Sequence, residues 1–269
     1  MNERLLEDID RNVPDGSRTN VQEREILVST EITEILERNN LEELSVRQEG
    51  TIPRRESEVV RFSLGEIKAH FDENIGLVEK EFEIADILLE SKGKEYAEPI
   101  WKSQLLFLES AFDFFMHEFN KFALTSMYDE VWPQTKEYKK IKVPLKLVEA
   151  VLKTGEPESW FLGHINETYK LNTMVSKKGF QMQLDLMGLK IRDIALCVYP
   201  GVNELEAINT VYHSLESLYE RRNYLVHQSN RKHEDASFYE AEISRTVVEN
   251  YIDFIKKLVD ALISNAASL

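Results

Sequence analysis

The chain has 269 residues, of which 42% are hydrophobic and 30% charged, with only 10 glycines and 7 prolines. This composition favours a helical protein with one large or two modest domains and a substantial core. A single cysteine excludes an intrachain disulfide, and no apolar run approaches the roughly 18 to 20 residues that span a bilayer. Because the first residues also contain no apolar signal core, we expect a cytoplasmic protein without a membrane partner.

The net charge of −15 is distributed unevenly along the sequence. Residues 1–100 carry 13 Lys and Arg against 25 Asp and Glu, whereas residues 130–200 carry 11 against 8. An acidic chain has no general affinity for nucleic acid, so any nucleic-acid site must be a local basic pocket.

Residues 1–62 are predicted to be an acidic, partly irregular N-terminal extension. Residues 1–30 are polar, and residues 31–48 show only partial helical spacing. Residues 50–58 (GTIPRRESE) combine glycine, proline and charge, which is typical of a boundary or linker. The remaining residues, 63–269, are expected to form the folded domain.

A long amphipathic helix is predicted over residues 66–90, where apolar side chains recur at helical spacing. Ser63 is the expected N-cap, and Glu66, three residues later, completes the pattern of a capping box. Gly93 follows the expected end of this helix.

A second long helix is predicted over residues 99–127, with Pro99 as its first residue because proline is well tolerated there. Its sequence is apolar nearly all round, which indicates a buried central element. Trp132 and Pro133 follow its expected end.

The rest of the sequence predicts shorter helices, a lysine-rich connector over residues 134–153, and two final long helices. The expected helical ranges are a short helix starting near Pro144, then 159–175, 180–188, a compact segment in 187–201, then 203–228 and 238–264. No period-two strand of useful length is present. We therefore predict an all-α protein, an up-and-down helical bundle with irregular connectors.

Common catalytic motifs are absent from the sequence. There is no glycine-rich phosphate loop and no G-x-S-x-G elbow, and the six histidines and one cysteine have no metal-ligand spacing. We therefore expect no cofactor and no metal.

The stretch SLYERRNYLVHQ, residues 217–228, places an arginine in an apolar row. At about 100° per residue, Arg222 falls within a stripe of apolar side chains. The members of the stripe are Val211, Leu215, Leu218, Leu225 and Val226. Because burying an unpaired guanidinium is costly, Arg222 must meet an anion, a partner chain or a site.

Other polar side chains share this helix. Asn223 and His227 are four residues apart and lie on one face, and Glu216 falls on nearly the same face. Arg222 lies about 140° from His227 on an ideal helix. Its side chain must therefore bend toward His227 or serve the histidine of a second copy of the chain.

This set of side chains suits a phosphodiester. A histidine can transfer protons near neutral pH, and an arginine binds phosphate oxygens and stabilises the charge of a pentavalent transition state. RNA supplies its own nucleophile, the 2′-hydroxyl, and Arg221, Arg231 and Lys232 are further candidates for RNA contacts. The alternative interpretation is a surface polar cluster or a capped helix end.

The string RNYLVH, residues 222–227, resembles the R-N-x-x-x-H signature of the HEPN superfamily. The surrounding LESLYERRNYLVHQ resembles the motif helix of HEPN domains of the RiboL-PSP type. LLFLESAFDFFMHEF, with Asp113, resembles their strongly apolar helix, and MGLKIRDI resembles the element shortly before the motif helix. The likeness covers roughly residues 63–265 and leaves residues 1–62 uncovered.

The resemblance implies a helical domain that forms a homodimer across its motif helices and acts as a metal-independent endoribonuclease. His227 would be the general acid and base, Arg222 would bind and polarise the phosphate, and Asn223 would orient both. Asp113 and Glu216 are candidate supporting acids. The expected products carry a 2′,3′-cyclic phosphate and a 5′-hydroxyl.

Members of this superfamily act in toxin–antitoxin, CRISPR-associated and anti-phage systems, so a cognate antitoxin or sensor protein is an expected partner. A second hypothesis is a non-catalytic HEPN-like module that binds a nucleotide or a partner protein. The acidic residues 1–62 are interpreted either as a solvated lead-in or as a regulator that repels RNA.

Overall fold

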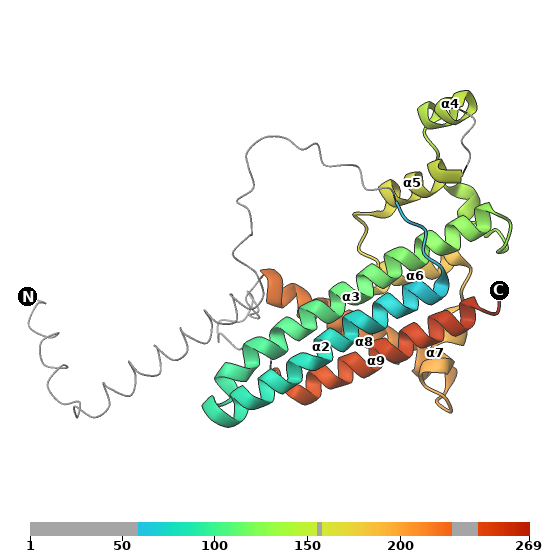
Figure 1. Ribbon diagram of the computed structural model, residues 1–269. Helices are drawn as coiled ribbons and strands as arrows, with labels where there is room; N and C mark the ends of the chain where they lie inside the picture. Colours follow the sequence, from blue (N-terminus) through green and yellow to red (C-terminus); the bar gives the residue numbers. More distant parts are fainter. Residues whose placement is uncertain (1–58, 155–157, 228–241) are drawn as a thin grey trace, which may run out of the picture. The chain divides into compact units, whose positions relative to one another are not determined.

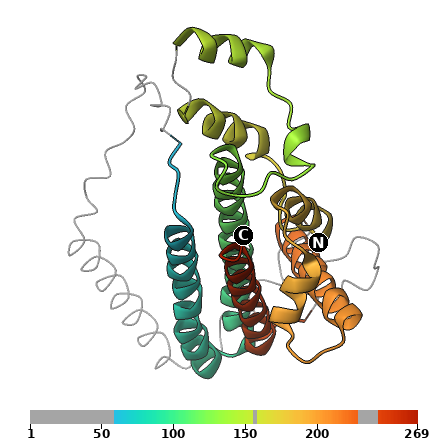
Figure 2. The same cartoon turned by 90° about the vertical axis from the view of Figure 1, so that its right-hand side faces the viewer.

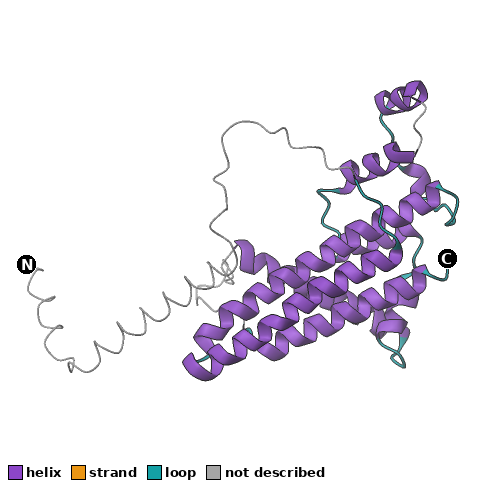
Figure 3. Cartoon of the chain, in the orientation of Figure 1, coloured by secondary structure: helices purple, strands orange, loops and turns teal. Residues whose placement is uncertain are grey.

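A computed structural model describes residues 59–154, 158–227 and 242–269. The chain divides into two units, Met1–Ser57 and Glu58–Leu269, and all the described helices belong to the second. Every regular element in the described ranges is a helix (Figure 3). This confirms the predicted all-α class, whereas the expectations for residues 1–58 lie outside the described residues.

Four long helices build an up-and-down bundle (Figure 1). They are α2 (Leu64–Lys92), α3 (Lys94–Tyr128), α8 (Glu204–His227) and α9 (Arg245–Ala266). α3 contacts the other three helices. Phe71 packs against Phe115, and the Gln104 side-chain amide donates a hydrogen bond of 2.8 Å to the Val78 carbonyl, so α2 and α3 are antiparallel.

Shorter elements connect α3 to α8. They are the 3₁₀ helix η2 (Tyr138–Lys140), α4 (Leu145–Thr154), α5 (Glu158–Tyr169), α6 (Lys177–Met187) and α7 (Ile191–Val198). α5 and α6 pack on α3, and α7 packs on α8 and α9. Both views show α4 standing apart from the long helices, beyond α5 (Figures 1 and 2). None of the described helices combines the length and apolar character that crossing a bilayer requires.

The start of α2 matches its prediction. The Ser63 hydroxyl accepts a hydrogen bond of 3.3 Å from the backbone N–H of Glu66, whose carboxylate accepts one of 2.8 Å from the backbone of Ser63. This is the reciprocal bonding of a capping box. The helix ends at Gly93, whose φ of 100° lies in a region that favours glycine.

The prediction that the next helix begins at Pro99 is wrong. Gly93 turns the chain within one residue, so α3 begins at Lys94 and Pro99 lies inside it. Proline there removes one hydrogen bond, to the carbonyl of the exposed Glu95 four residues earlier. Burial of Ala97 against the core stabilises this added first turn.

α3 is the buried centre of the domain, as its apolar sequence predicted. Leu105, Leu108, Phe112, Phe115 and Phe119 are fully buried along its length. Phenylalanine rings stack within the core, with 5.5 Å between the ring centroids of Phe115 and Phe119. A charged side chain buried on this apolar helix, such as Glu109, therefore needs a partner or a function.

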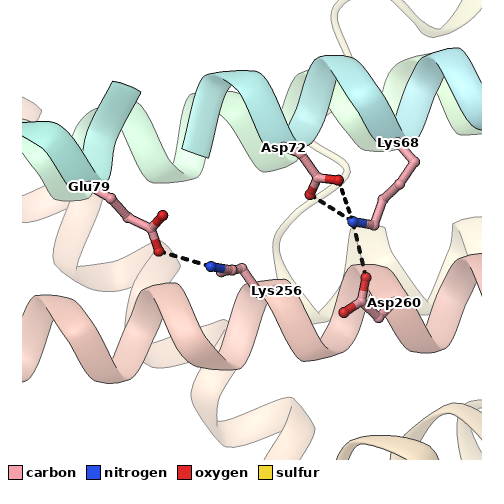
Figure 4. Close-up of polar contacts among 5 residues, drawn as sticks. All are labelled: Lys68, Asp72, Glu79, Lys256 and Asp260. Atoms are coloured by element: carbon pink, nitrogen blue, oxygen red, sulfur yellow. Dashed lines mark hydrogen bonds and ion pairs between the residues drawn. The ribbon is translucent and has the colours of Figure 1, made fainter. Parts of the chain in front are cut away.

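Ion pairs fix α9 antiparallel to α2 (Figure 4). Lys68 contacts Asp72 at 2.6 Å and Asp260 at 3.2 Å, and Lys256 contacts Glu79 at 2.9 Å. Although partial burial lowers the pKa of Lys68, its hydrogen bonds to the two aspartates outweigh this and raise it. Because these side chains remain partly exposed to solvent, each pair contributes at most about 1 kcal/mol.

Candidate functional site

The apolar stripe of α8 is buried in the middle of the helix, and its burial decreases toward the C-terminal end. Val211, Leu215 and Leu218 are buried, but Val226 is 47% exposed. The stripe therefore continues beyond the core of the single chain and ends at an exposed apolar side chain. The half-buried Arg222 lies on the turn before Val226.

Arg222 meets an anion of its own chain, Glu109 on α3. Its Nε atom lies 3.5 Å from Oε2 of Glu109, and its Nη1 donates a hydrogen bond of 3.2 Å to Oδ1 of Asn223. The Glu109 side chain is only 9% exposed, against 34% for Arg222. At 3.5 Å the contact is mainly electrostatic rather than a strong hydrogen bond. Glu109 is thus the anion that a guanidinium in an apolar row requires.

Glu109 has a perturbed acidity. Burial raises the pKa of its carboxyl group, the positive charge of Arg222 lowers it in part, and the negative charge of Asp113 raises it again. The pKa of Glu109 is raised overall, because the loss of hydration on burial outweighs the attraction of the guanidinium 3.5 Å away. Glu109 therefore loses its proton, and the ion pair with Arg222 forms, at a higher pH than an ordinary glutamate would require.

Arg222 also has unused hydrogen-bonding capacity. Its contacts engage Nε and one N–H of Nη1, and no other residue in the described ranges accepts from the rest of the guanidinium. An arginine has five N–H donors in a fork that matches two phosphate oxygens. The exposed edge of Arg222 therefore has the geometry of an anion-binding group.

Glu109 begins a row of polar side chains on successive turns of α3. Asp113 lies one turn further on, and its Oδ2 is 3.5 Å from Nε2 of His117. Its Oδ1 is buried and has no hydrogen-bond partner in the described part of the chain. Asp113, expected as a supporting acid, thus lies beside the partner of Arg222 and next to an imidazole.

The other expected site residues lie on α8 or beyond its end. The backbone of α8 ends at His227, whose side chain is outside the described part of the chain, as are Arg231 and Lys232. Glu216 is half-buried on α8. The guanidinium of Arg221 donates a hydrogen bond of 2.6 Å to the carbonyl of Glu242, just before α9, and burial lowers its pKa.

A cleft of about 290 Å³ adjoins this row, between α3 and α5. Asp113, His117, Lys121, Tyr169 and Lys170 are among its lining residues. A second cleft of about 240 Å³ shares Tyr169 and extends to the connector after α3. Neither cleft could be predicted from the sequence, because both depend on tertiary packing. The first forms between α3 and α5, and the second forms between the connector after α3, the end of α5 and α6.

Among the described residues, no group of three or more His, Cys, Asp or Glu side chains is arranged to hold a metal ion. Comparisons with protein-family models, with curated proteins and with solved structures find no match to this chain. The resemblance to HEPN domains therefore depends on the motif residues and their helix context alone.

Proposed function

We propose that this protein is a metal-independent endoribonuclease of the HEPN type, acting as a toxin or an anti-phage effector. The observation that supports the proposal most is the environment of Arg222. Its guanidinium is held from one side by Glu109 and Asn223 and keeps a solvent-facing edge. An arginine held in this way is preorganised for a phosphate.

Each motif residue has a role in the proposed reaction. Arg222 binds the scissile phosphate and stabilises its additional negative charge in the transition state. Asn223, bonded to Arg222, orients the guanidinium. His227 removes the proton of the ribose 2′-hydroxyl, whose oxygen attacks phosphorus, and a histidinium donates a proton to the departing 5′-oxygen. The products are a 2′,3′-cyclic phosphate and a 5′-hydroxyl.

A homodimer is part of this proposal, since two histidines in one cleft can serve as base and acid at the same time. The exposure of Val226, on the turn that carries the motif, supports a partner surface there. Light scattering should then give about twice 31.4 kDa. A monomer at micromolar concentration would count against a shared cleft.

The test is cleavage of total cellular RNA and transfer RNA with mapping of the new ends. His227→Ala and Arg222→Ala should abolish cleavage, and both 5′-hydroxyl and cyclic phosphate ends should appear with the unchanged protein. His213→Ala, an exposed histidine on the same helix, and Arg192→Ala, an exposed arginine on α7, are matched controls that should retain activity. Cleavage should persist in chelator, and expression should slow growth only when His227 is intact.

A non-catalytic helical module for a nucleotide or protein partner is the second candidate. The observation that favours it is the same ion pair, because Glu109 gives Arg222 a structural partner within the chain. If the unchanged protein and His227→Ala leave every RNA intact and are equally harmless to cells, this second function replaces the first.

A further inference from the structure

The segment between α3 and α5 is a cluster of exposed lysines in an otherwise acidic protein. We call residues 136–153, which include η2 and α4, the lysine arm. Its lysines are Lys136, Lys139, Lys140, Lys142, Lys146 and Lys153, and all six are exposed. Only Glu137 and Glu149 oppose them within the arm. A positive cluster on a chain of net charge −15 calls for an explanation.

Most of these lysines have no carboxylate partner among the residues that the structure describes. Lys140 contacts Glu137 at 2.5 Å, but the other five make no ion pair with any described residue. Some lysines outside the arm are paired, as Lys121 is with Glu118 at 2.7 Å and Lys256 with Glu79 at 2.9 Å, whereas the arm gathers unpaired lysines in one short segment. The positive charge of the arm is therefore available to an external anion.

The base of the arm is fixed to the domain rather than loosely attached. The hydroxyl of Thr135 donates a hydrogen bond of 2.9 Å to the Leu186 carbonyl. The carbonyl of Lys142 lies 3.0 Å from Nε2 of His164, and Tyr138 packs edge-on against Phe161. The lysines of the connector consequently project from a defined backbone.

The arm adjoins the clefts that lead toward the candidate site. Lys140 lines the second cleft, Tyr169 lines both clefts, and Asp113 lines the first, one helical turn from Glu109. Tyr169 is half-buried where the two clefts meet, so its aromatic ring lies along the route from the arm to Asp113. The clefts themselves carry both signs of charge, because carboxylates such as Asp113 and Glu137 line them beside lysines. The positive charge that single-strand binding combines with aromatic rings therefore comes from the arm.

The length of this path fits a short oligonucleotide. From Glu109 to Tyr128, where α3 ends, a rise of 1.5 Å per residue gives roughly 28 Å. This distance corresponds to about eight stacked nucleotides at 3.4 Å each. A strand with its scissile phosphate at Arg222 would therefore reach the lysine arm.

We propose that the lysine arm binds the single-stranded backbone of the RNA substrate and holds the strand along the two clefts toward Arg222. This inference rests on the proposed ribonuclease function. An anionic membrane is the competing occupant, because Leu145 and Leu152 are 71% and 81% exposed beside the lysines of α4. RNA is favoured, since four of the six lysines precede α4 and lie on the connector, of which Glu137, Lys140 and Ile141 line the second cleft.

The test compares two five-lysine variants of the full chain, both carrying His227→Ala to prevent cleavage. In the arm variant Lys136, Lys139, Lys142, Lys146 and Lys153 become Gln. In the control variant the exposed Lys80, Lys92, Lys178, Lys190 and Lys257 become Gln, so both lose the same charge. The probe is a labelled single-stranded RNA of about 12 nucleotides, followed by fluorescence anisotropy across a salt series.

The arm variant should bind this RNA at least tenfold more weakly near 0.1 M salt, with less than threefold loss in the control variant. The slope of log affinity against log salt should fall by about 0.7 for each lost phosphate contact, or by about 3.5 if all five lysines contact phosphates. Equal losses in both variants, or no loss, would overturn the proposal. So would unchanged RNA affinity combined with arm-dependent binding to phosphatidylserine vesicles.

Cleavage by the protein with His227 intact separates this inference from the proposed function. If no RNA is cut but the arm variant still loses RNA affinity, the ribonuclease proposal fails and the arm remains an RNA-binding element. If RNA is cut and the arm variant binds and cuts it as well as the control variant, the arm proposal fails alone.

Discussion

Removing the positive charge of Arg222 should destabilise the fold in a pH-dependent way. Arg222→Met keeps most of the side-chain volume but leaves the nearly buried Glu109 without its partner. At 3.5 Å, Coulomb's law gives about 1.2 kcal/mol in water and about 4.7 kcal/mol at an effective dielectric constant of 20. Because Glu109 is buried and Arg222 partly exposed, we expect a loss of about 2 to 3 kcal/mol near neutral pH.

The loss should shrink in acid. The folded-state pKa of Glu109 is raised above its ordinary value of 4.5, so the folded protein binds this proton more tightly than the unfolded chain. Stability contributed by the protonated form is complete below the unfolded pKa and is lost as pH rises through the folded pKa. Arg222→Met raises that folded pKa further, and its stability should fall more steeply with pH than that of the unchanged protein.

Urea unfolding between pH 4.5 and pH 8 measures this difference, and the melting temperature near neutral pH should fall by about 5 to 10 °C. Lys256→Met, which breaks the exposed pair with Glu79, is the control and should lose at most about 1 kcal/mol at any pH. Replacing both Glu109 and Arg222 by Met should recover stability relative to Arg222→Met. A pH-independent loss, or simple addition of the two single losses, would refute the coupling.

Three further predictions concern the fold. Ser63→Ala removes the capping box of α2 and should reduce the unfolding free energy by about 1 kcal/mol in urea titration. Gly188→Ala should destabilise the fold by about 1 kcal/mol or more, because the φ of Gly188 is 78° and the new Cβ would lie 2.9 Å from Thr135. Gly65→Ala should stabilise the fold by up to about 1 kcal/mol, because the space around Gly65 in α2 is open, and calorimetry compares the two variants. Phe115→Ala opens a cavity in the core and should reduce the unfolding free energy by about 3 to 5 kcal/mol, measured in urea.

The sequence predicted the helices well because local signals specify them. The apolar spacing of α2 and the bonding between Ser63 and Glu66 depend on neighbours within one or two turns. Pro99 misled the prediction, because proline is favoured at a helix start but is also tolerated in an early turn when the core holds that turn. The direct link at Gly93 decided where α3 begins, and this depends on how two helices pack.

The site was predicted only in part, because half of it comes from another helix. The sequence indicated that Arg222 needs an anion, but the periodicity of α8 could not identify which residue supplies it. Glu109 lies more than one hundred residues away, within the apolar sequence LLFLESAF. The sequence marked Glu109 in the same way as Arg222, as a charged residue on a helix face that is otherwise apolar. Two such charges of opposite sign on neighbouring helices are grounds for predicting a pair.

The pair also makes a prediction about RNA binding, because Glu109 and a substrate phosphate compete for one guanidinium. Glu109→Gln keeps the side-chain shape and removes the negative charge, so RNA affinity should rise about fivefold, equivalent to about 1 kcal/mol. In a His227→Ala background, affinity should increase as pH falls through the raised pKa of Glu109, and Glu109→Gln should remove this dependence. Glu81→Gln is the control: burial also raises the pKa of Glu81, but no described cation pairs with it. Unchanged binding by Glu109→Gln would show that Arg222 is a structural group and does not bind phosphate. Weaker binding would show that Glu109 orients the guanidinium and does not compete with the phosphate.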